Sequence, residues 1–397
     1  MQLQNLVQRF TSDIVGEEQF EKMLVKSAAD NTRLRVKFGI DPTFTDVHLG
    51  HSVPIRLLRA FQDHGHLPVL IIGDGTARLG DPTGRNEQRP ALTVEDVARN
   101  SATYLEQIGT ILDLDPAKCE VRHNSEWFGD MNFFDALKLA SQSTAARLLE
   151  RDDFKKRMQQ NQAVHLHEMM YPLMQGYDSV MVESDVELGG NDQLFNLHMG
   201  RQMQERAGQR PQICMTTPLL LGTDGRKMSK TYGNHVGLNA GANDMYGKIM
   251  SLSDDGMPLW FQLATTMSDD EIAQCLAGHP RQAKDALARN ITSQIHGEDA
   301  ANAAAEVFVQ QFAKNEIPDE INECVVGESP MKLASLLKEA GLVASTSEAR
   351  RLLKDGAVKV DSELQSDPNW LVELSATDAV LLQIGKRRLM NVRCASR

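Results

Sequence analysis

The chain has 397 residues, of which 41% are hydrophobic and 24% are charged, as is ordinary for a globular protein with a sizeable core. No stretch stays apolar for the roughly 18 residues of a membrane-spanning helix, so we expect no membrane partner. The N-terminus lacks the basic start and long apolar run of a secretory signal. The five cysteines are odd in number and widely spaced, which argues against a disulfide framework and indicates a cytoplasmic protein.

The charge is unevenly distributed. A net charge of −12 argues against a protein that coats nucleic acid indiscriminately. Residues 331–397 nevertheless hold 11 Lys/Arg against 8 Asp/Glu, so the C-terminal end is mildly basic on an acidic body. This asymmetry indicates that a polyanion would meet the C-terminal end, although a solvated surface explains the charges equally well.

The first part of the chain alternates strand and helix patterns. The segment "LRVKFGID" (34–41) has the two-residue period of a strand, and helical spacing begins at Val53. The short apolar run "LPVLIIGD" (67–74) is typical of a strand buried on both faces of a parallel sheet. Similar strand patterns recur at 184–190 and 211–222, on either side of a helical pattern at 191–206. These patterns predict an open α/β sheet whose ligands lie beyond the carboxyl ends of the strands.

We expect the chain to have four parts. Residues 1–235 form a Rossmann-like catalytic domain, with a helical insertion at about 130–165 and a loop at 226–235. Residues 236–318 look all-helical, and the polar, acidic stretch 319–330 reads as a linker. Residues 331–397 form a small α+β unit.

The first motif that could have a chemical function is "HLGH" (48–51), at the start of a predicted helix. Gly50 lets a ligand approach the backbone closely, and the free N–H groups of a helix start bind anions, above all phosphate. Two imidazoles could donate hydrogen bonds to phosphate oxygens. A zinc pair lacks convincing further ligands nearby, but a purely structural pair stays open, because this spacing also arises by chance.

A second motif, "GTDGRKMSKTYGN" (222–234), combines glycines with the cations Arg226, Lys227 and Lys230. It is either a solvated loop or a flexible arm whose ammonium groups close over a polyphosphate. A third, "IIGDGTARLGDPTGR", places Asp74 and Asp81 at the carboxyl edge of the predicted sheet, and it lacks the G-K-[ST] ending of a P-loop.

Two more segments carry polar residues in patterns that suit a pocket. In "YPLMQGYDSV" the residues Tyr171, Gln175 and Asp178 recur at i, i+4 and i+7, so they share one helix face. That face either lines a polar pocket or lies on the surface. In "ELGGNDQLFN" paired glycines end a strand, and Asp192 and Gln193 follow at a helix start, where a carboxylate suits ribose hydroxyls.

Taken together, the motifs resemble those of a known family. The order "HLGH … KMSKT" resembles the HIGH and KMSKS motifs of class I aminoacyl-tRNA synthetases. With "FGIDPT", "GDPTGR", "YPLMQGYD" and "GGNDQ" in the family's order, the chain resembles the bacterial tyrosyl-tRNA synthetases. The tail, with "STSEARRLLKDGAVKV", resembles the S-four-type RNA-binding domain that ends those enzymes. The resemblance covers essentially the whole chain.

This resemblance implies an aminoacyl-tRNA ligase. Such an enzyme activates L-tyrosine with ATP to tyrosyl-adenylate and pyrophosphate, and then transfers the tyrosyl group to the 3'-end of tRNA(Tyr), releasing AMP. Mg²⁺ is expected to travel with ATP, with no metal held in a protein cage. Family members are cytoplasmic homodimers, with the helical insertion at the contact between subunits, and the helical domain lies on the anticodon side.

The resemblance also assigns roles to residues. The catalytic groups on the ATP phosphates and the leaving pyrophosphate are Thr43, His48, His51, Lys227 and Lys230. The other ATP-binding residues are Gly50, Gly190, Met228 and Asp192, which holds the ribose. The α-ammonium of tyrosine is held by Tyr171, Gln175 and Asp81, and its phenol by Asp178, while the pocket is completed by Asp41 and Gln193.

The sequence departs from the family pattern at three positions. Lys37 stands where the better-known bacterial branch has a tyrosine that helps to read the phenol, as in a second bacterial branch. Thr231 replaces the final serine of the lysine motif and keeps its hydroxyl, and Asn191 stands where a smaller hydroxyl residue or a threonine is common. Lys37 therefore leaves open which residue reads the phenol.

Three other functions compete with this interpretation. A tryptophanyl-type synthetase shares the scaffold but normally lacks the C-terminal unit and the Gln175–Asp178 pattern. A paralogue that forms tyrosyl-adenylate for another acceptor is a second alternative, against which the intact tail argues. A non-catalytic RNA-binding protein is the third, and it would have lost His48, Lys227 or Lys230.

Overall fold

The computed structural model describes residues 2–43, 45–80, 93–229, 232–310, 321, 323–385 and 388–395. The chain divides into two compact units, Met1–Ala304 and Ala305–Arg397. Within the described residues, none of the helices combines the length and the apolar character needed to cross a bilayer.

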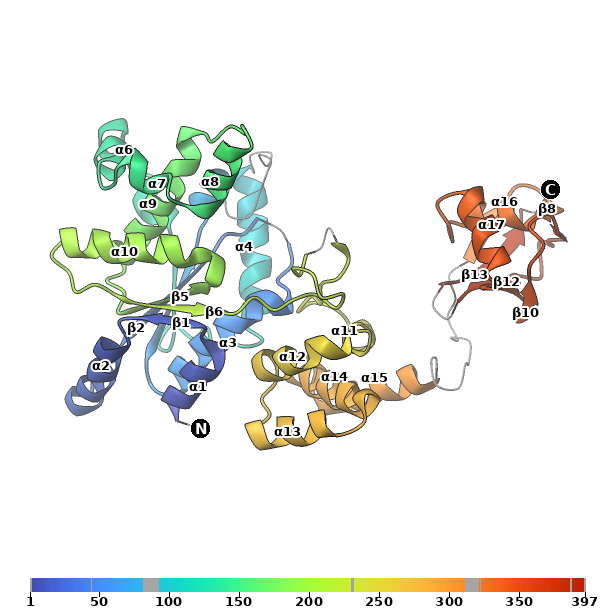
Figure 1. Ribbon diagram of the computed structural model, residues 1–397, viewed down its shortest axis with the longest axis horizontal. Coiled ribbons are helices and arrows are strands. Elements are labelled where there is room, and N and C mark those ends of the chain that lie inside the picture. The colour runs from blue at the N-terminus through green and yellow to red at the C-terminus, as the bar shows by residue number, and fades with distance from the viewer. Residues whose placement is uncertain are drawn as a thin grey trace. The chain divides into compact units, whose positions relative to one another are not determined.

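A six-stranded sheet forms the centre of the first unit. Its strand order is β1-β6-β5-β2-β3-β4, and all neighbours pair in parallel except β1, which runs antiparallel to β6 at the edge. The strands are β1 (Asp13–Val15), β2 (Arg35–Ile40), β3 (Leu67–Ile72), β4 (Glu120–His123), β5 (Val186–Gly190) and β6 (Ile213–Thr217). The predicted parallel α/β sheet is confirmed. The side chains of β3 and β6 are buried on both faces because helices cover both sides of the sheet (Figure 1).

The helices of this part of the chain are α1 (Leu3–Phe10), α2 (Glu17–Asp30), α3 (Leu49–Asp63), α4 (Val94–Ile108), α5 (Ser125–Phe128), α6 (Phe133–Ala140), α7 (Ala145–Leu148), α8 (Asp152–Gln159), α9 (Leu166–Met181) and α10 (Leu194–Arg206). In Figure 1, α9 and α10 lie on one side of the sheet and α1 and α2 on the other. The short helices α6, α7 and α8 occupy the stretch expected to be a helical insertion.

The strand order determines where a ligand can bind. The strands β2 and β5 are neighbours in the sheet. The chain leaves β2 through α3 to reach β3 on one side, and it leaves β5 through α10 to reach β6 on the other side. Connections that leave in opposite directions open a crevice at the carboxyl ends of β2 and β5. The segments after these strands are "DPT" and "NDQ", both of which carry predicted site residues.

The described part of the predicted helical domain consists of α11 (Ala242–Met250), α12 (Met257–Ala264), α13 (Asp269–Ala277), α14 (Pro280–His296) and α15 (Glu298–Phe308). Helix α12 contacts α1 and α3, and the guanidinium of Arg9 in α1 donates to the carbonyls of Gln262 and Met267 at 2.7 and 2.6 Å. Most of these helices therefore belong to the same compact unit as the sheet.

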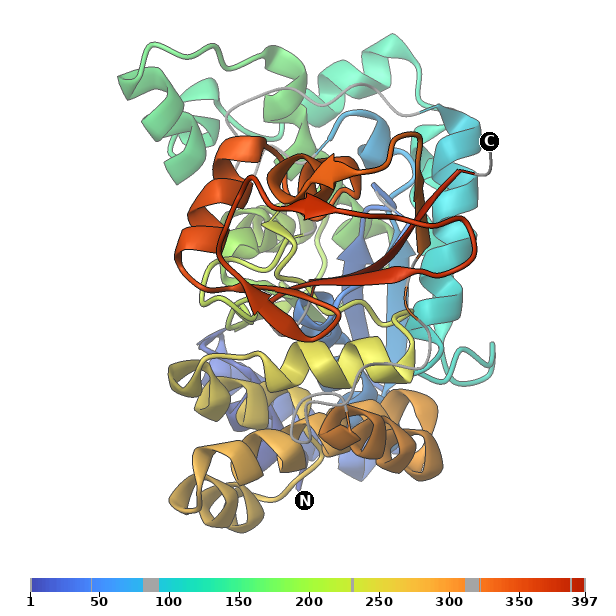
Figure 2. The same ribbon diagram turned by 90° about the vertical axis from the view of Figure 1, so that its right-hand side faces the viewer.

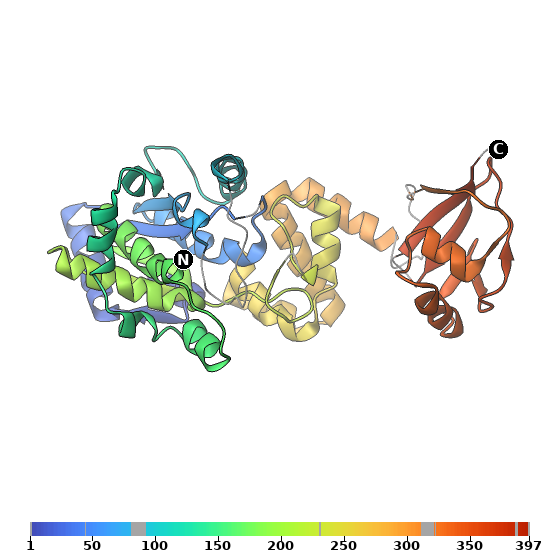
Figure 3. The same ribbon diagram turned by 90° about the horizontal axis from the view of Figure 1, so that it is seen from above.

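The second unit is a small α+β fold. Its main sheet has the order β10-β9-β12-β13-β7, and β11 pairs with β8. Figures 2 and 3 show its two helices beside these strands, and Leu333 and Leu336 of the first helix share a core with Leu382 and Val392 of the sheet. The elements are β7 (Glu323–Val326), β8 (Met331–Lys332), α16 (Leu333–Glu339), α17 (Thr346–Lys354), β9 (Val358–Val360), β10 (Glu363–Gln365), β11 (Leu371–Val372), β12 (Val380–Ile384) and β13 (Arg388–Cys394).

Part of the expected linker 319–330 belongs to this sheet. Strand β7 pairs in parallel with β13, and Val326 is 2% exposed within the core. A polar, acidic composition suggested a solvated connection, but an edge strand needs only alternate apolar residues to pack.

Helices α9 and α10 approach each other at two glycines. A Cβ on Gly176 would lie 2.9 Å from the sulfur of Met203 and 3.1 Å from the backbone nitrogen of Gly200. A Cβ on Gly200 would in turn lie 2.9 Å from Oγ of Ser179. The absence of side chains at this crossing lets α9 lie close to α10, and α9 carries three of the predicted site residues.

We expect Gly176→Ala to lower the free energy of unfolding by about 1–3 kcal/mol, because the backbone of α10 must move to accept the methyl group. The control is Gly247→Ala in α11, where a Cβ meets nothing within 4 Å and alanine gains up to about 1 kcal/mol of helix propensity. Urea unfolding of both variants measures the difference. Equal midpoints would show that the helix crossing does not need glycine.

Candidate functional site

A cavity of about 300 Å³ lies at the carboxyl ends of β2 and β5. Every predicted site residue that the structure describes lines this cavity: Asp41, Thr43, His48, Gly50, His51, Tyr171, Gln175, Asp178, Gly190, Asp192, Gln193, Lys227 and Met228. The remaining two, Asp81 and Lys230, lie outside the described residues. Residues from motifs more than 170 positions apart in the sequence thus meet at one site.

The "HLGH" motif forms the start of α3. His48 is the extended N-cap residue, and its ring stacks on that of His51, with centroids 3.8 Å apart and planes at 16°. A Cβ on Gly50 would lie 3.0 Å from the His48 ring, so a larger residue would push this imidazole away. A helix N-terminus and two imidazoles therefore face the same cavity, which is the arrangement expected of an anion site.

The same motif forms backbone hydrogen bonds with the residues that follow the loop 222–234, which contains Lys227 and is called the lysine loop below. His48 forms an antiparallel bridge with Gly237, Leu49 N–H donates to the carbonyl of Val236 at 2.9 Å, and Leu238 N–H donates to that of Val47 at 2.8 Å. Backbone pairing thus brings the end of the loop against the helix start. Lys227 and Met228, in the described part of "KMSKT", line the same cavity as His48 and His51, as the hypothesis of a shared phosphate site requires.

The lysine loop is anchored from within by Asn234, which is 3% exposed. Its side chain accepts from Ser229 N–H at 2.8 Å and donates to a carboxylate oxygen of Asp224 at 2.7 Å and to the carbonyl of Lys227 at 3.2 Å. The Lys227 ammonium lies 3.4 Å from a carboxylate oxygen of Asp192, at the mouth of the cavity. Sequence analysis did not single out Asn234, although it ends the quoted segment "GTDGRKMSKTYGN".

Asp41 lies at the centre of one wall of the cavity. The Tyr171 hydroxyl donates to its Oδ2 at 2.9 Å, and Thr76 Oγ1 donates to its Oδ1 at 2.7 Å. A Cβ on Gly73 would lie 2.0 Å from Asp41 Oδ1, so glycine is required where β3 ends beside this carboxylate. Two strand ends and α9 together fix the orientation of Asp41 and Tyr171.

Asp178 is buried at the far end of the same helix face, 4% exposed. Its Oδ1 accepts from Trp127 Nε1 at 2.9 Å, and its Oδ2 accepts from Asn124 Nδ2 at 3.4 Å. Burial raises the pKa of Asp178 to about 7, although the charge of Lys37 and the two hydrogen bonds lower it; Glu187 raises it further. Sequence analysis missed Asn124 and Trp127, which follow the short strand β4 and so reach the same sheet edge.

Gln175 is held by its neighbours on both sides. Its amide oxygen accepts from Asn196 Nδ2 at 2.8 Å, and its amide nitrogen donates to Glu187 Oε1 at 3.3 Å. Asn196 also donates to the side chain of Gln193 at 2.9 Å, which couples two of the predicted pocket residues.

Two other residues noted in the sequence do not line the cavity. Asp74 accepts hydrogen bonds from Ser125 N–H at 2.8 Å and Oγ at 2.7 Å and lies 3.1 Å from His123 Nδ1. Burial raises the pKa of Asp74, but these hydrogen bonds outweigh it and hold the pKa at about 2. Lys37 is fully buried beneath α9 and donates to residues of that helix and of β5.

No group of three or more His, Cys, Asp or Glu side chains suited to a metal ion occurs within the described ranges.

The open, mostly parallel sheet with a cavity at its switch point, lined by the start of a helix, defines a Rossmann-like protein. A family model described as "tRNA synthetases class I (W and Y)" matches residues 29–313, and an S4 domain model matches residues 331–378. The chain therefore belongs to the class I tRNA synthetase family of the W and Y type.

Relatives within this family match nearly the whole chain. A tyrosine–tRNA ligase from Idiomarina loihiensis is 50% identical over 380 residues, which are 94% of each chain. A tyrosine–tRNA ligase from Moorella thermoacetica is 46% identical over 390 residues, 96% of this chain and 94% of the other. The predicted resemblance to bacterial tyrosyl-tRNA synthetases is confirmed.

Solved structures share the fold at lower identity. The tyrosyl-tRNA synthetase of Archaeoglobus fulgidus, complexed with L-tyrosine, has a TM-score of 0.60 and 22% identity, covering 77% of this chain and 99% of that chain. A C-terminally truncated mitochondrial tyrosyl-tRNA synthetase of Aspergillus nidulans has a TM-score of 0.64 and 23% identity, covering 78% of this chain and 94% of that chain. Both likenesses concern the fold.

We expect Asp178 to gain its proton near pH 7. Because the folded-state pKa is raised, the stabilisation from this group is complete below the unfolded pKa and is lost as the pH rises through about 7. The indole N–H resonance of Trp127, which donates to Asp178, should shift with that midpoint in an NMR titration. Asp178→Asn should abolish the shift; a shift that survives this change would have another origin.

Proposed function

We propose that this cavity catalyses the reaction for which the relatives are named, the ligation of tyrosine to tRNA. It activates L-tyrosine with ATP to tyrosyl-adenylate and pyrophosphate, and it then transfers the tyrosyl group to the 3'-end of tRNA(Tyr). The observation that carries this proposal is the convergence of the helix start at His48, the ammonium of Lys227 and the polar face of α9 on one cavity. One end suits a polyphosphate and the other suits an amino acid with a polar side chain.

Tyrosine occupies the end of the cavity beneath α9. Asp178 accepts the hydrogen bond of the phenol, because it is a buried acceptor already oriented by Trp127 and Asn124. Tyr171, Gln175 and Asp81 hold the α-ammonium group, and the pocket is completed by Asp41 and Gln193. Phenylalanine is rejected because it would bury Asp178 without a hydrogen-bond donor from the ligand.

ATP occupies the end of the cavity at the start of α3. Thr43, His48 and His51 contact its phosphates, Gly50 and Gly190 leave room for the nucleotide, and Asp192 holds the ribose. The lysine loop closes over the leaving pyrophosphate through Lys227 and Lys230, with Met228 against the nucleotide. Mg²⁺ arrives with ATP as part of the substrate.

The chemistry requires positioning and charge stabilisation more than a protein nucleophile. A carboxylate oxygen of tyrosine attacks the α-phosphorus in line, and the bond from this phosphorus to the pyrophosphate oxygen breaks. Negative charge grows on the departing pyrophosphate, where the imidazoles and ammonium groups stabilise it. A terminal ribose hydroxyl of the tRNA then attacks the tyrosyl carbonyl, loses its proton, and displaces AMP.

The remaining parts of the chain have roles around this site. The helical region 236–318 lies on the anticodon side of the bound tRNA, and the S-four-type unit, 331–397, binds RNA. Two copies of the chain form a homodimer through the helical insertion, where Phe133 and Phe134 are each 72% exposed. The five cysteines are free thiols, which suits a reducing cytoplasm.

A tryptophanyl-type enzyme is the nearest alternative, and it is not favoured. The relatives that match nearly the full chain are tyrosine–tRNA ligases, and residues 331–378 match an S4 domain.

We expect the two ends of the cavity to respond differently to substitution in a pyrophosphate-exchange assay. Asp178→Asn should raise the KM for tyrosine about 10- to 100-fold with little change in the KM for ATP, because it removes a charged acceptor. Lys227→Ala should instead lower kcat by on the order of a hundredfold, since its ammonium acts on charge that develops in the transition state.

Tyrosine-dependent exchange by the unaltered protein is the reference for both variants. Exchange that depends on tryptophan instead would favour the tryptophanyl-type alternative. Losses of the same size in both KM values for each variant would contradict the division of the cavity into two ends.

We expect a chain that ends at Gln310 to retain exchange within about twofold but to charge tRNA at least about tenfold less well, because it lacks the basic RNA-binding unit. This end point removes β7 together with β13, so no unpaired strand is left behind. Charging and exchange are measured on the same preparation. A parallel loss of both activities would show that residues 311–397 support the fold of the catalytic part.

A further inference from the structure

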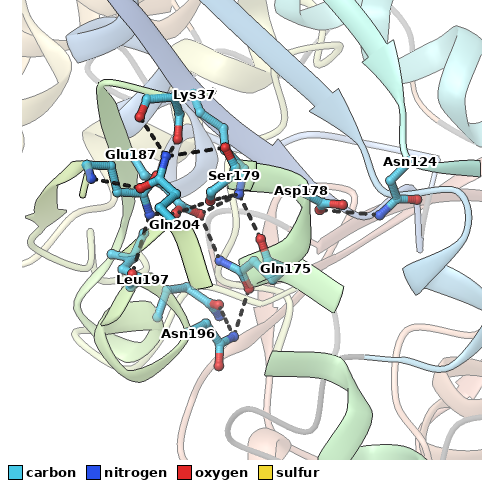
Figure 4. Close-up of polar contacts among 12 residues, drawn as sticks. Lys37, Asn124, Gln175, Asp178, Ser179, Glu187, Asn196, Leu197 and Gln204 are labelled. Atoms are coloured by element: carbon cyan, nitrogen blue, oxygen red, sulfur yellow. Dashed lines mark hydrogen bonds and ion pairs between the residues drawn. The ribbon is translucent and has the colours of Figure 1, made fainter. Parts of the chain in front are cut away.

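Lys37 and Glu187 form an ion pair inside the protein. Lys37 Nζ lies 2.8 Å from Glu187 Oε1, and the two side chains are 0% and 1% exposed (Figure 4). Lys37 lies on β2 and Glu187 on the adjacent strand β5, where they are Cα partners in the sheet. A buried pair usually adds little stability over apolar residues of the same size, so stability alone does not account for its presence here.

The partners of this pair belong to the helix that lines the cavity. Lys37 Nζ also donates to the backbone carbonyl of Gln175 at 2.9 Å and to Ser179 Oγ at 2.8 Å. Glu187 accepts from Ser179 Oγ at 2.9 Å, from Gln175 Nε2 at 3.3 Å and from Gln212 Nε2. All three donors of the ammonium group are therefore used, and its bonds span the turn of α9 that contains Asp178 (Figure 4).

Lys37 itself lies outside the cavity. It is absent from the lining of the cavity, whereas Gln175 and Asp178 are part of it. Its charge is nonetheless felt by Asp178, as is the opposite charge of Glu187. Any effect of the pair on tyrosine must therefore pass through Gln175 and Asp178.

We propose that the Lys37–Glu187 pair is a positioning and specificity device for the phenol of tyrosine: it fixes the Gln175–Ser179 turn and balances the charge that keeps Asp178 a hydrogen-bond acceptor. The proposal rests on the proposed role of Asp178 as the acceptor of the phenol. It also answers the question that Lys37 raised in the sequence, because here a buried charge pair replaces a side chain that contacts the ligand.

The charged groups around Asp178 determine whether each substitution makes this carboxylate easier or harder to protonate. The charged groups that face it are Lys37 on β2 and Glu187 on β5, and the neutral donors are Trp127 of α5 and Asn124 at the start of that helix. Asp41 and Tyr171 line the same cavity and are bonded to each other. Removing Lys37 leaves Asp178 with only the negative neighbour, whereas neutralising Glu187 leaves it with only the positive one.

These opposite changes form the test. Tyrosine binding without ATP is measured by equilibrium dialysis from about pH 5.5 to 9. Each variant is compared with the unaltered protein at the same pH, so that titration of the ligand's own ammonium group affects both equally. In the unaltered protein, we expect the Kd to rise as the pH falls below a midpoint near 7, because the acceptor becomes protonated. We expect Lys37→Met to move this midpoint up by about one pH unit and Glu187→Gln to move it down by a similar amount.

At pH 7 Lys37→Met should therefore weaken tyrosine binding several-fold, while Glu187→Gln should maintain or improve it. The double variant Lys37→Met/Glu187→Met, which removes both charges together, should return the midpoint to within a few tenths of a unit of the original. It also keeps the test usable if the single lysine variant folds poorly. If the pair had a purely structural role, all three variants would bind tyrosine more weakly than the unaltered protein at every pH.

Arg35→Leu is the matched control. Arg35 lies on the same strand and pairs with Glu120 through two bonds of 2.7 Å, away from the cavity, so its loss should leave the midpoint unchanged. Asp178→Asn distinguishes a wrong assignment of the phenol acceptor from a wrong role for the Lys37–Glu187 pair. If this variant binds tyrosine normally, the proposed acceptor is wrong; if it binds weakly while Lys37→Met and Glu187→Gln keep the original midpoint or shift it in one direction, only the role of the pair is wrong.

Discussion

The parallel pairing of β2 with β5 is the constraint on which the cavity depends. It sets side by side two strand ends that are separated by about 150 residues in the chain, one followed by Asp41 and Thr43 and the other by Asp192 and Gln193. The connections leave these strands in opposite directions, so no crossing segment fills the space between their ends. The helix start at His48 and the face of α9 then form the walls of that space.

A second consequence of this pairing is that polar groups lie deep in the first unit. Lys37 and Glu187 face each other across the β2–β5 ladder, and Ser179 and Gln212 complete their hydrogen bonds. Such a cluster is tolerated only when nearly every donor and acceptor is used, which restricts how α9 and α10 can pack on the sheet. The glycines at the α9–α10 crossing provide the close approach that this restriction demands. Fold and pocket are therefore specified by the same contacts.

The lysine loop shows how a segment rich in glycine and cations is held in place. Asn234 ties both sides of the loop together from inside, and the bridge between His48 and Gly237 joins its end to the helix start. The ammonium of Lys227 lies beside Asp192 because both ends of the loop are fixed.

Local patterns in the sequence determined a large part of this protein. Strand and helix periods identified β2, β3, β5 and β6 together with α3 and α10, because burial of one face gives the sequence a regular apolar period. Helix α4 was not identified. The motifs and the family resemblance identified thirteen of the residues that line the cavity. The edge strand β1, the short β4 and β7 in the expected linker were not identified, since their pairing depends on distant partners.

Only the tertiary structure decided which groups surround Lys37, and that Asn124 and Trp127 contact Asp178 while Asn234 contacts the loop of Lys227. The role of a buried lysine depends on which carboxylate lies across the sheet from it, and Glu187 is 150 residues away in the chain. No local pattern in the sequence predicts such a contact, because the energy of a buried charge depends on all the groups around it in space.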